Sequence, residues 1–192
     1  KRLGKKSAVL LGQMSEGVAT GYSQKTAGEW LIVGRALIEE LPSLRSQALE
    51  AKRYARWSPL QEGDLADELY LRAVALEHII IQVRMIARTL FDVAVEGDVN
   101  SQPNRSLAAA ISNASYAVQA NSEIAEGSNY ELITVGIAND LRLNSSNVAA
   151  DLIANANHIR QEALGKEISI ISNIERIADS IDESLPALRE IE

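Results

Sequence analysis

Apolar residues recur at alternating steps of three and four along residues 65–94, and this spacing constrains the chain more than any other feature. Such steps return to one face of an α-helix, whereas a half-buried strand alternates at every second residue. The pattern predicts a helix of about eight turns that Gly97 and Asp98 bring to an end. Its seam consists of Leu65, Leu69, Ala73, Leu76, Ile80, Val83, Ala87, Leu90 and Ala94.

The same periodicity appears along most of the remaining chain, and strand alternation does not. A composition with 4% aromatic residues, 11 Gly and 4 Pro also favours helices over sheets. We expect an all-α fold in which about five or six long helices form an antiparallel bundle, with residues 1–192 as a single soluble domain. The other helices are predicted near residues 3–21, 30–57, 107–127, 128–165 and 168–188. Their apolar seams include Leu3, Leu10, Met14 and Val18 in the first, Trp30, Val33 and Leu37 in the second, Leu107, Ile111, Ala114 and Val118 in the third, and Ile168, Ile171 and Ile174 in the last.

Several residues mark where these helices begin, bend and end. Gly21 and Gly165 are expected to end two of them, and Pro42 should kink the helix over 30–57. The helix that carries the 65–94 seam begins either at Ser58, where Pro59 and Gln61 complete a capping box, or at Asp64.

Charge and cysteine usage exclude several function classes. The chain has no cysteine, so disulfides, thiolate metal sites and cysteine nucleophiles are ruled out. Residues 1–60 carry ten Lys and Arg against five Asp and Glu, whereas residues 61–192 carry nine against 21. An acidic body repels phosphate backbones, so we expect no nucleic-acid partner.

Four basic residues lie at the start of the chain: Lys1, Arg2, Lys5 and Lys6. They are either solvated charges or a basic segment that lies against an anionic membrane surface. The apolar run that follows them stops at Gly12, which is too short for a signal peptide or a membrane span. The absence of an initiator Met suggests a piece excised from a longer chain.

Common catalytic motifs are absent from the sequence. There is no Walker loop, no dinucleotide-binding glycine turn, no His-Glu-x-x-His and no Gly-x-Ser-x-Gly. Neither His78 nor His158 follows a Glu by three residues, as a helical di-iron site requires. We therefore expect no enzyme, no cofactor and no metal site, with both histidines on helix surfaces.

Glu77, Arg84 and Arg88 form the strongest polar grouping. They share one stripe of the predicted helix, about 100° from its apolar seam, since seven and four residues are nearly whole turns. Two guanidinium groups one turn apart suit a carboxylate or phosphate, which predicts a small-anion site. The alternative is that both arginines lie on the flank of the bundle and pair with acidic neighbours.

Two further patterns have a structural and a functional interpretation. Residues 52–57 mix basic and aromatic side chains, as surfaces that bind a partner do. The pattern is better explained by Tyr54 and Trp57 packing in the core at the C-terminal end of a helix, with the cations near the helix dipole. Gly17 and Gly21 form Gly-x-x-x-Gly, which outside an apolar membrane segment indicates close helix packing.

Two stretches together carry a family resemblance. The first stretch, residues 36–59, combines a Leu-Pro-x-Leu helix with the basic-aromatic stretch and reads ALIEELPSLRSQALEAKRYARWSP. The second, residues 69–92, contains Leu-Glu followed by Arg84 and Arg88 and reads LYLRAVALEHIIIQVRMIARTLFD. This combination resembles the cytoplasmic helical region of FUSC-type proteins, the fusaric acid resistance and aromatic acid exporter transporters of bacteria. In that family such regions follow a block of membrane-spanning helices, which residues 1–192 do not contain.

The resemblance implies a role in the efflux of aromatic or organic acids. We expect a cytoplasmic domain on the inner face of the bacterial inner membrane that acts in the assembly or regulation of an exporter. Its expected partners are the membrane-spanning portion of the same chain, sister subunits in a homo-oligomer, and a small aromatic or organic acid. The basic cluster at residues 1–6 fits a juxtamembrane segment under the positive-inside rule.

A second function class remains open from the residues alone. A helical module that binds a small anion through Arg84 and Arg88 could signal by helix displacement. The sequence does not decide between this sensing module and an assembly domain.

Overall fold

The computed structural model describes all residues except 56–62, 97–102, 125–129, 155–160 and 186–192. The described part is helical almost throughout and contains no strand, which confirms the all-α prediction. Its helices are α1 (Arg2–Thr20), α2 (Gln24–Glu39), α3 (Leu41–Ala55), α4 (Gly63–Glu96), α5 (Arg105–Glu123), α6 (Tyr130–Ala154) and α7 (Gln161–Asp182).

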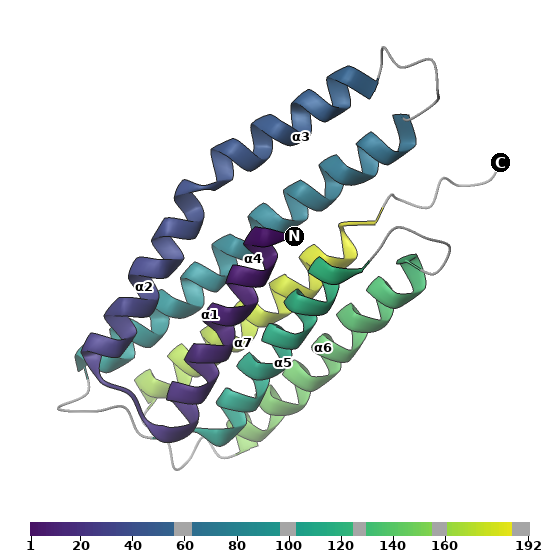
Figure 1. Ribbon diagram of the computed structural model, residues 1–192. Helices are drawn as coiled ribbons and strands as arrows, with labels where there is room; N and C mark the ends of the chain where they lie inside the picture. Colours follow the sequence, from purple (N-terminus) through teal and green to yellow (C-terminus); the bar gives the residue numbers. More distant parts are fainter. Residues whose placement is uncertain (56–62, 97–102, 125–129, 155–160, 186–192) are drawn as a thin grey trace.

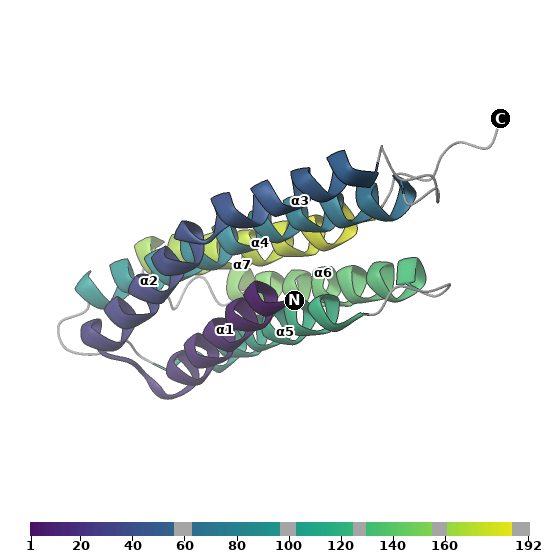
Figure 2. The ribbon, with the colours of Figure 1, turned by 45° about the horizontal axis from the view of Figure 1, so that its top comes forward.

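The helices form an antiparallel bundle of two layers, as Figures 1 and 2 show. One layer contains α2, α3, α4 and α7, and the other contains α1, α5 and α6. Consecutive helices reverse direction except α2 and α3, which continue along the same course. The layers meet most extensively where α6 packs on α7, whereas α1 and α2 touch much less.

Side-chain caps fix the starts of two helices. Ser23 Oγ accepts a hydrogen bond from the Thr26 backbone N–H at 3.1 Å at the start of α2. Asn104 Oδ1 accepts one from the Leu107 backbone N–H at 3.0 Å at the start of α5. Each cap satisfies a backbone donor that has no partner within its helix. Gly21 ends the preceding α1 at φ 90°, as expected for a glycine in this place.

Small residues bring α1 and α5 into close contact. A Cβ added to Gly4 would lie 2.8 Å from Ser122 Cβ, so the two backbones approach more closely than ordinary side chains allow. Ser115 Oγ donates to the Ala8 carbonyl at 2.7 Å, and Ser15 Oγ donates to the Ala108 carbonyl at 2.8 Å. These bonds cross between the helices and fix their register.

The core runs between the two layers and is aliphatic. Predicted seam residues of α1 and α5 are all buried where the structure describes them, and so is the second half of the α4 seam from Ile80 onward. The largest fully buried side chains are Leu10, Leu11, Met14, Leu37, Ile79, Ile80, Ile86, Leu90, Ile111, Leu141, Ile170 and Ile171.

Three seam predictions are wrong. Leu69, Val33 and Ile168 are exposed, with Leu69 at 40%. Between residues 66 and 76 of α4 only Ala66 and Ala75 are buried, so the bundle leaves the Leu69 side of this segment uncovered. In α2 the buried face follows Ala27, Trp30 and Gly34 instead of turning toward Val33.

The helix predicted over residues 30–57 is interrupted two residues before Pro42, and one predicted helix end is wrong. The chain breaks at Glu40 between α2 and α3, with Pro42 in the first turn of α3, where a missing N–H costs no helical bond. Gly165 lies inside α7, which begins at Gln161, and therefore does not end the preceding helix. The capping candidates Ser58, Pro59 and Gln61 lie outside the described residues.

Candidate functional site

The three α4 residues of the predicted anion site have different surroundings. Glu77 Oε2 lies 3.7 Å from Arg45 Nε of α3. Arg88 Nε donates to both carboxylate oxygens of Asp92, at 2.9 and 3.0 Å, one turn further along α4. This is the pairing that the alternative interpretation expected for arginines on the flank of the bundle.

Arg84 is half-buried where α4 passes α2. A Cβ built on Gly34 of α2 would lie 3.5 Å from the Cα of Arg84, so the glycine sits directly against the α4 backbone. Within the described part of the chain Arg84 makes no salt bridge, unlike Arg88. The structure gives the two arginines no shared carboxylate, and a joint anion site at Arg84 and Arg88 stays a prediction.

The basic residues at the start of the chain are engaged by carboxylates of the bundle. Arg2 and Lys6 both contact Glu40 at the α2–α3 break, at 2.5 and 2.6 Å. Lys5 lies 3.2 Å from Glu123 at the end of α5. Lys1 precedes α1 and is exposed. Three of the four predicted membrane-facing cations therefore have an intramolecular partner.

These contacts shift the titration of both carboxyls. The hydrogen bond from Lys6, together with the charges of Arg2 and Lys6, lowers the pKa of Glu40. The hydrogen bond from Lys5 lowers the pKa of Glu123 in the same way. Nearby cations favour the ionised form, so both carboxylates are charged at neutral pH.

A groove separates α1 from α2, and its first part is a hollow of about 550 Å³ that we call the cationic hollow. Its apolar side chains come from both helices and include Val9 and Leu10 of α1 with Leu37 of α2. Its polar rim is formed by Arg2, Lys5, Lys6 and Glu40, which the preceding contacts hold in place.

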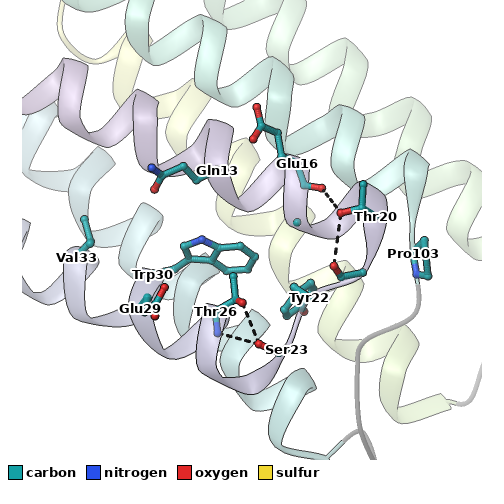
Figure 3. A pocket seen from close by; sticks show the side chains of 12 residues that line it. Gln13, Glu16, Thr20, Tyr22, Ser23, Thr26, Glu29, Trp30, Val33 and Pro103 are labelled. Atoms are coloured by element: carbon teal, nitrogen blue, oxygen red, sulfur yellow. Dashed lines mark hydrogen bonds between the residues drawn. The ribbon is translucent and has the colours of Figure 1, made fainter.

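The second part of the groove is a larger hollow of about 1110 Å³ near the α1–α2 turn, and it shares Gln13 and Val33 with the cationic hollow. Figure 3 shows the indole of Trp30 on its wall near Tyr22, with Gln13 across from it. The Tyr22 and Trp30 ring centroids lie 5.1 Å apart. A Cβ on Gly17 would lie 2.4 Å from Trp30 Cη2, so the predicted close packing at this glycine is confirmed.

The lining of the groove is mixed in character. It combines apolar walls with a few charged and hydroxyl groups, as small-molecule sites do. Among the described residues, no group of His, Asp and Glu side chains is placed to hold a metal ion. His78 is exposed, with Nδ1 3.9 Å from Glu183 Oε2, and His158 lies outside the described residues.

Helix α6 presents a second surface that sequence periodicity did not single out. Its buried face packs on α5 and α7, yet large apolar side chains also point outward. Leu132, Leu143 and Ile153 are 75, 63 and 61% exposed. A surface helix of a bundle ordinarily carries polar residues on that side, so this face is unusual.

The preferred interpretation of the basic-aromatic stretch was wrong where the structure describes it. Tyr54 is 77% exposed near the end of α3 and is not part of a core. Lys52 pairs with Asp67 of α4 at 2.9 Å and lies 5.0 Å from the ring centroid of Tyr70. Arg56 and Trp57 lie outside the described residues.

Two charged residues that the sequence does not single out, Arg142 and Glu167, bond to segments distant in the chain. Arg142 of α6 donates to Asp179 and Asp182 of α7, both at 3.0 Å. Burial raises the pKa of Glu167, against a smaller opposite effect of the 2.8 Å hydrogen bond that its carboxylate accepts from Asn104. Neither contact has a local sequence signal, because the partners lie at least 37 residues apart in the chain.

No helix in the described part of the chain is both long enough and apolar enough to span a membrane. Comparison of the chain with family models, curated proteins and solved structures gives no match.

Proposed function

We propose that this chain is the cytoplasmic helical domain of a FUSC-type exporter of aromatic or organic acids, at the inner face of the bacterial inner membrane. Within that exporter it works in assembly, as a rigid helical body that contacts other protein surfaces. The proposal joins the family resemblance of residues 36–59 and 69–92 to the exposed surface of the bundle.

The two stretches that carry the resemblance are neighbours in space. They belong largely to α3 and α4, which run antiparallel beside each other. Arg45 pairs with Glu77, and Lys52 pairs with Asp67, so charged contacts join the hairpin at two levels. A resemblance confined to one packed unit is more informative than two separated matches.

The single observation that carries the assembly role is the outward face of α6. Leaving Leu132, Leu143 and Ile153 in water costs hydrophobic free energy that a protein partner would recover by covering them. The described residues hold no comparable gathering of catalytic groups. The surface therefore favours protein contact over chemistry as the work of this domain.

The exporter assignment is tested on the full-length product of the reading frame that contains residues 1–192. We expect apolar segments of about 20 residues upstream of Lys1 and recovery of the product with membranes. Cells that lack the gene should become sensitive to aromatic acids, and the intact gene should restore resistance. A full-length product that stays in the cytosol and has no such segment would overturn the assignment.

A small-anion-sensing module is the second candidate, and the cationic hollow favours it. An aromatic carboxylate has an apolar body for the hollow and a charge for its lysine rim. If the domain senses such ligands, benzoate should raise its melting temperature, and Lys6→Gln should reduce that rise. Loss of the rise in Arg84→Ala and Arg88→Ala, with Lys6→Gln unaffected, would instead place the ligand on α4.

A further inference from the structure

We infer that the outward face of α6 pairs with the same face of a second copy of this chain, antiparallel and centred on Leu143. The inference rests on the assembly role proposed above but not on the identity of any exporter.

The outer stripe of α6 has a repeat that reads the same from both ends. Its positions follow steps of four, three, four, four, three and four, all are exposed, and none is charged. These steps stay on one face of a helix and make two 11-residue repeats, a period that suits a straight or slightly right-handed helix pair. The stripe consists of Leu132, Gly136, Asn139, Leu143, Asn147, Ala150 and Ala154.

The two inner pairs of the stripe are also alike in residue type about Leu143. An antiparallel pair centred there brings Asn139 to the level of Asn147 of the second copy and Gly136 to the level of Ala150. The two amides can each donate and accept, which fixes the register, and the two small residues let the helices approach. At both ends a large residue, Leu132, meets a small one, Ala154.

A parallel pair would fit less well. It would set Leu132 against Leu132, which holds the helices apart at that level. One turn further along it would set Gly136 against Gly136, which leaves a void between them. It would also align the two helix dipoles side by side, whereas antiparallel helices oppose them favourably. The stripe therefore favours the two-fold antiparallel arrangement.

Gly136 gives an independent reason to expect a second helix here. A glycine inside a helix costs about 1 kcal/mol relative to alanine. A Cβ added to Gly136 would meet no described atom within 4 Å, so the packing of this chain on itself does not require the glycine. Gly17, by contrast, is required by the indole of Trp30. Close approach of another backbone explains a glycine at Gly136.

The first test is the mass of the 192-residue chain in solution, measured by sedimentation equilibrium over a wide range of protein concentration. We expect a dimer, and we expect Leu143→Glu to weaken it roughly 30-fold or more because two carboxylates would meet at the axis. The matched control is Ile32→Glu on α2, where the native side chain is 65% exposed, and it should leave the dimer intact. A chain that is monomeric throughout, or a dimer that Leu143→Glu leaves unchanged, overturns the inference.

Gly136→Leu separates loss of pairing from loss of folding. Leucine favours a helix more than glycine, and a Cβ at this exposed position meets no described atom within 4 Å, so circular dichroism should show an unimpaired fold while the dimer is lost. A dimer that survives this substitution contradicts close approach at Gly136.

Cysteine cross-linking tests the direction, because the native chain has no cysteine. Two Cys residues join only when their Cα atoms lie within about 7 Å. Leu143→Cys lies at the axis and should cross-link to its copy on mild oxidation. Leu132→Cys lies about 17 Å from Leu143 along the helix, so its two copies are about 33 Å apart and should not react. Efficient cross-linking of Leu132→Cys to itself would overturn the antiparallel arrangement.

These results are separable from the exporter assignment. A membrane-bound, active exporter whose domain is monomeric refutes the pairing alone. A cytosolic full-length product whose α6 faces cross-link as described refutes the exporter alone.

Discussion

Substituting Gly17 by alanine adds one methyl group at the tightest contact between α1 and α2. The new Cβ would lie 2.4 Å from Trp30 Cη2 and 2.6 Å from Cζ2. Atoms do not approach so closely, so the indole or the helix must move. Overpacking of this kind costs about 1–3 kcal/mol, and the gain in helix propensity offsets up to about 1 kcal/mol of it.

Gly12→Ala is the matched control in the same helix. Its added Cβ would lie 3.6 Å from Ser115 Oγ, an ordinary contact, so only the favourable propensity remains. We expect the two variants to differ by about 2 kcal/mol in the free energy of unfolding, which is roughly 6 °C in melting temperature for a chain of this size. Thermal and urea denaturation followed by circular dichroism measures both quantities.

A double substitution isolates the contact between Gly17 and Trp30. The atoms that Gly17→Ala would strike belong to the six-membered ring of the Trp30 indole, which phenylalanine places differently. In a Trp30→Phe background the penalty at Gly17 should therefore shrink. If Gly17→Ala is as stable as Gly12→Ala in the native background, Trp30 does not sit against this glycine and the account of the α1–α2 contact is refuted.

Three further variants test ion pairs and a hydrogen bond. The hydrogen bond from Lys6 holds the pKa of Glu40 below the usual 4.5, so the ionised carboxylate stabilises the fold above about pH 4.5. This stabilisation is lost as the pH falls through the lowered pKa. Glu40→Gln should therefore make the free energy of unfolding, measured by urea denaturation, depend less on pH in the acid range. Burial raises the pKa of Glu167, so ionisation opposes folding at neutral pH and the penalty is relieved as the pH falls toward 4.5. Urea melts at pH 7 and pH 5 should show that Glu167→Gln removes this gain, and a gain of unchanged size would contradict the assigned cause. Tyr22→Phe removes the 3.2 Å bond from the phenol to the buried carbonyl of Leu90 and should lower the free energy of unfolding by about 1 kcal/mol, whereas an unchanged urea midpoint would show that the bond contributes nothing.

The helices themselves were predictable because their signals are local. The run of apolar steps from Ile80 to Ala94 marks both the existence of α4 and the face that it buries. Gly21 and Pro42 act through their own backbone geometry, so their effects also follow from the sequence. Gly165 was misjudged because a glycine ends a helix only where the surrounding chain allows it, and here α7 continues through it.

The candidate surfaces were less predictable because they depend on which helices become neighbours. Arg88 satisfies its charge with Asp92 within its own helix, a pairing that four-residue spacing allows. Glu40, by contrast, lies 34 residues from Lys6 in the chain, and only the packing of α1 beside the α2–α3 break brings them together. The groove walls combine two helices in the same way.

The sequence by itself determined that this chain folds into apolar-seamed helices, because helix formation depends on spacing and on residues a few positions apart. The tertiary structure decided which seam residues are covered, where the α1–α2 groove opens and which face of α6 is left outside. Those properties depend on contacts between segments distant in sequence. Leu69 and Leu143 share the apolar character of core residues, yet the packing of the helices leaves both exposed.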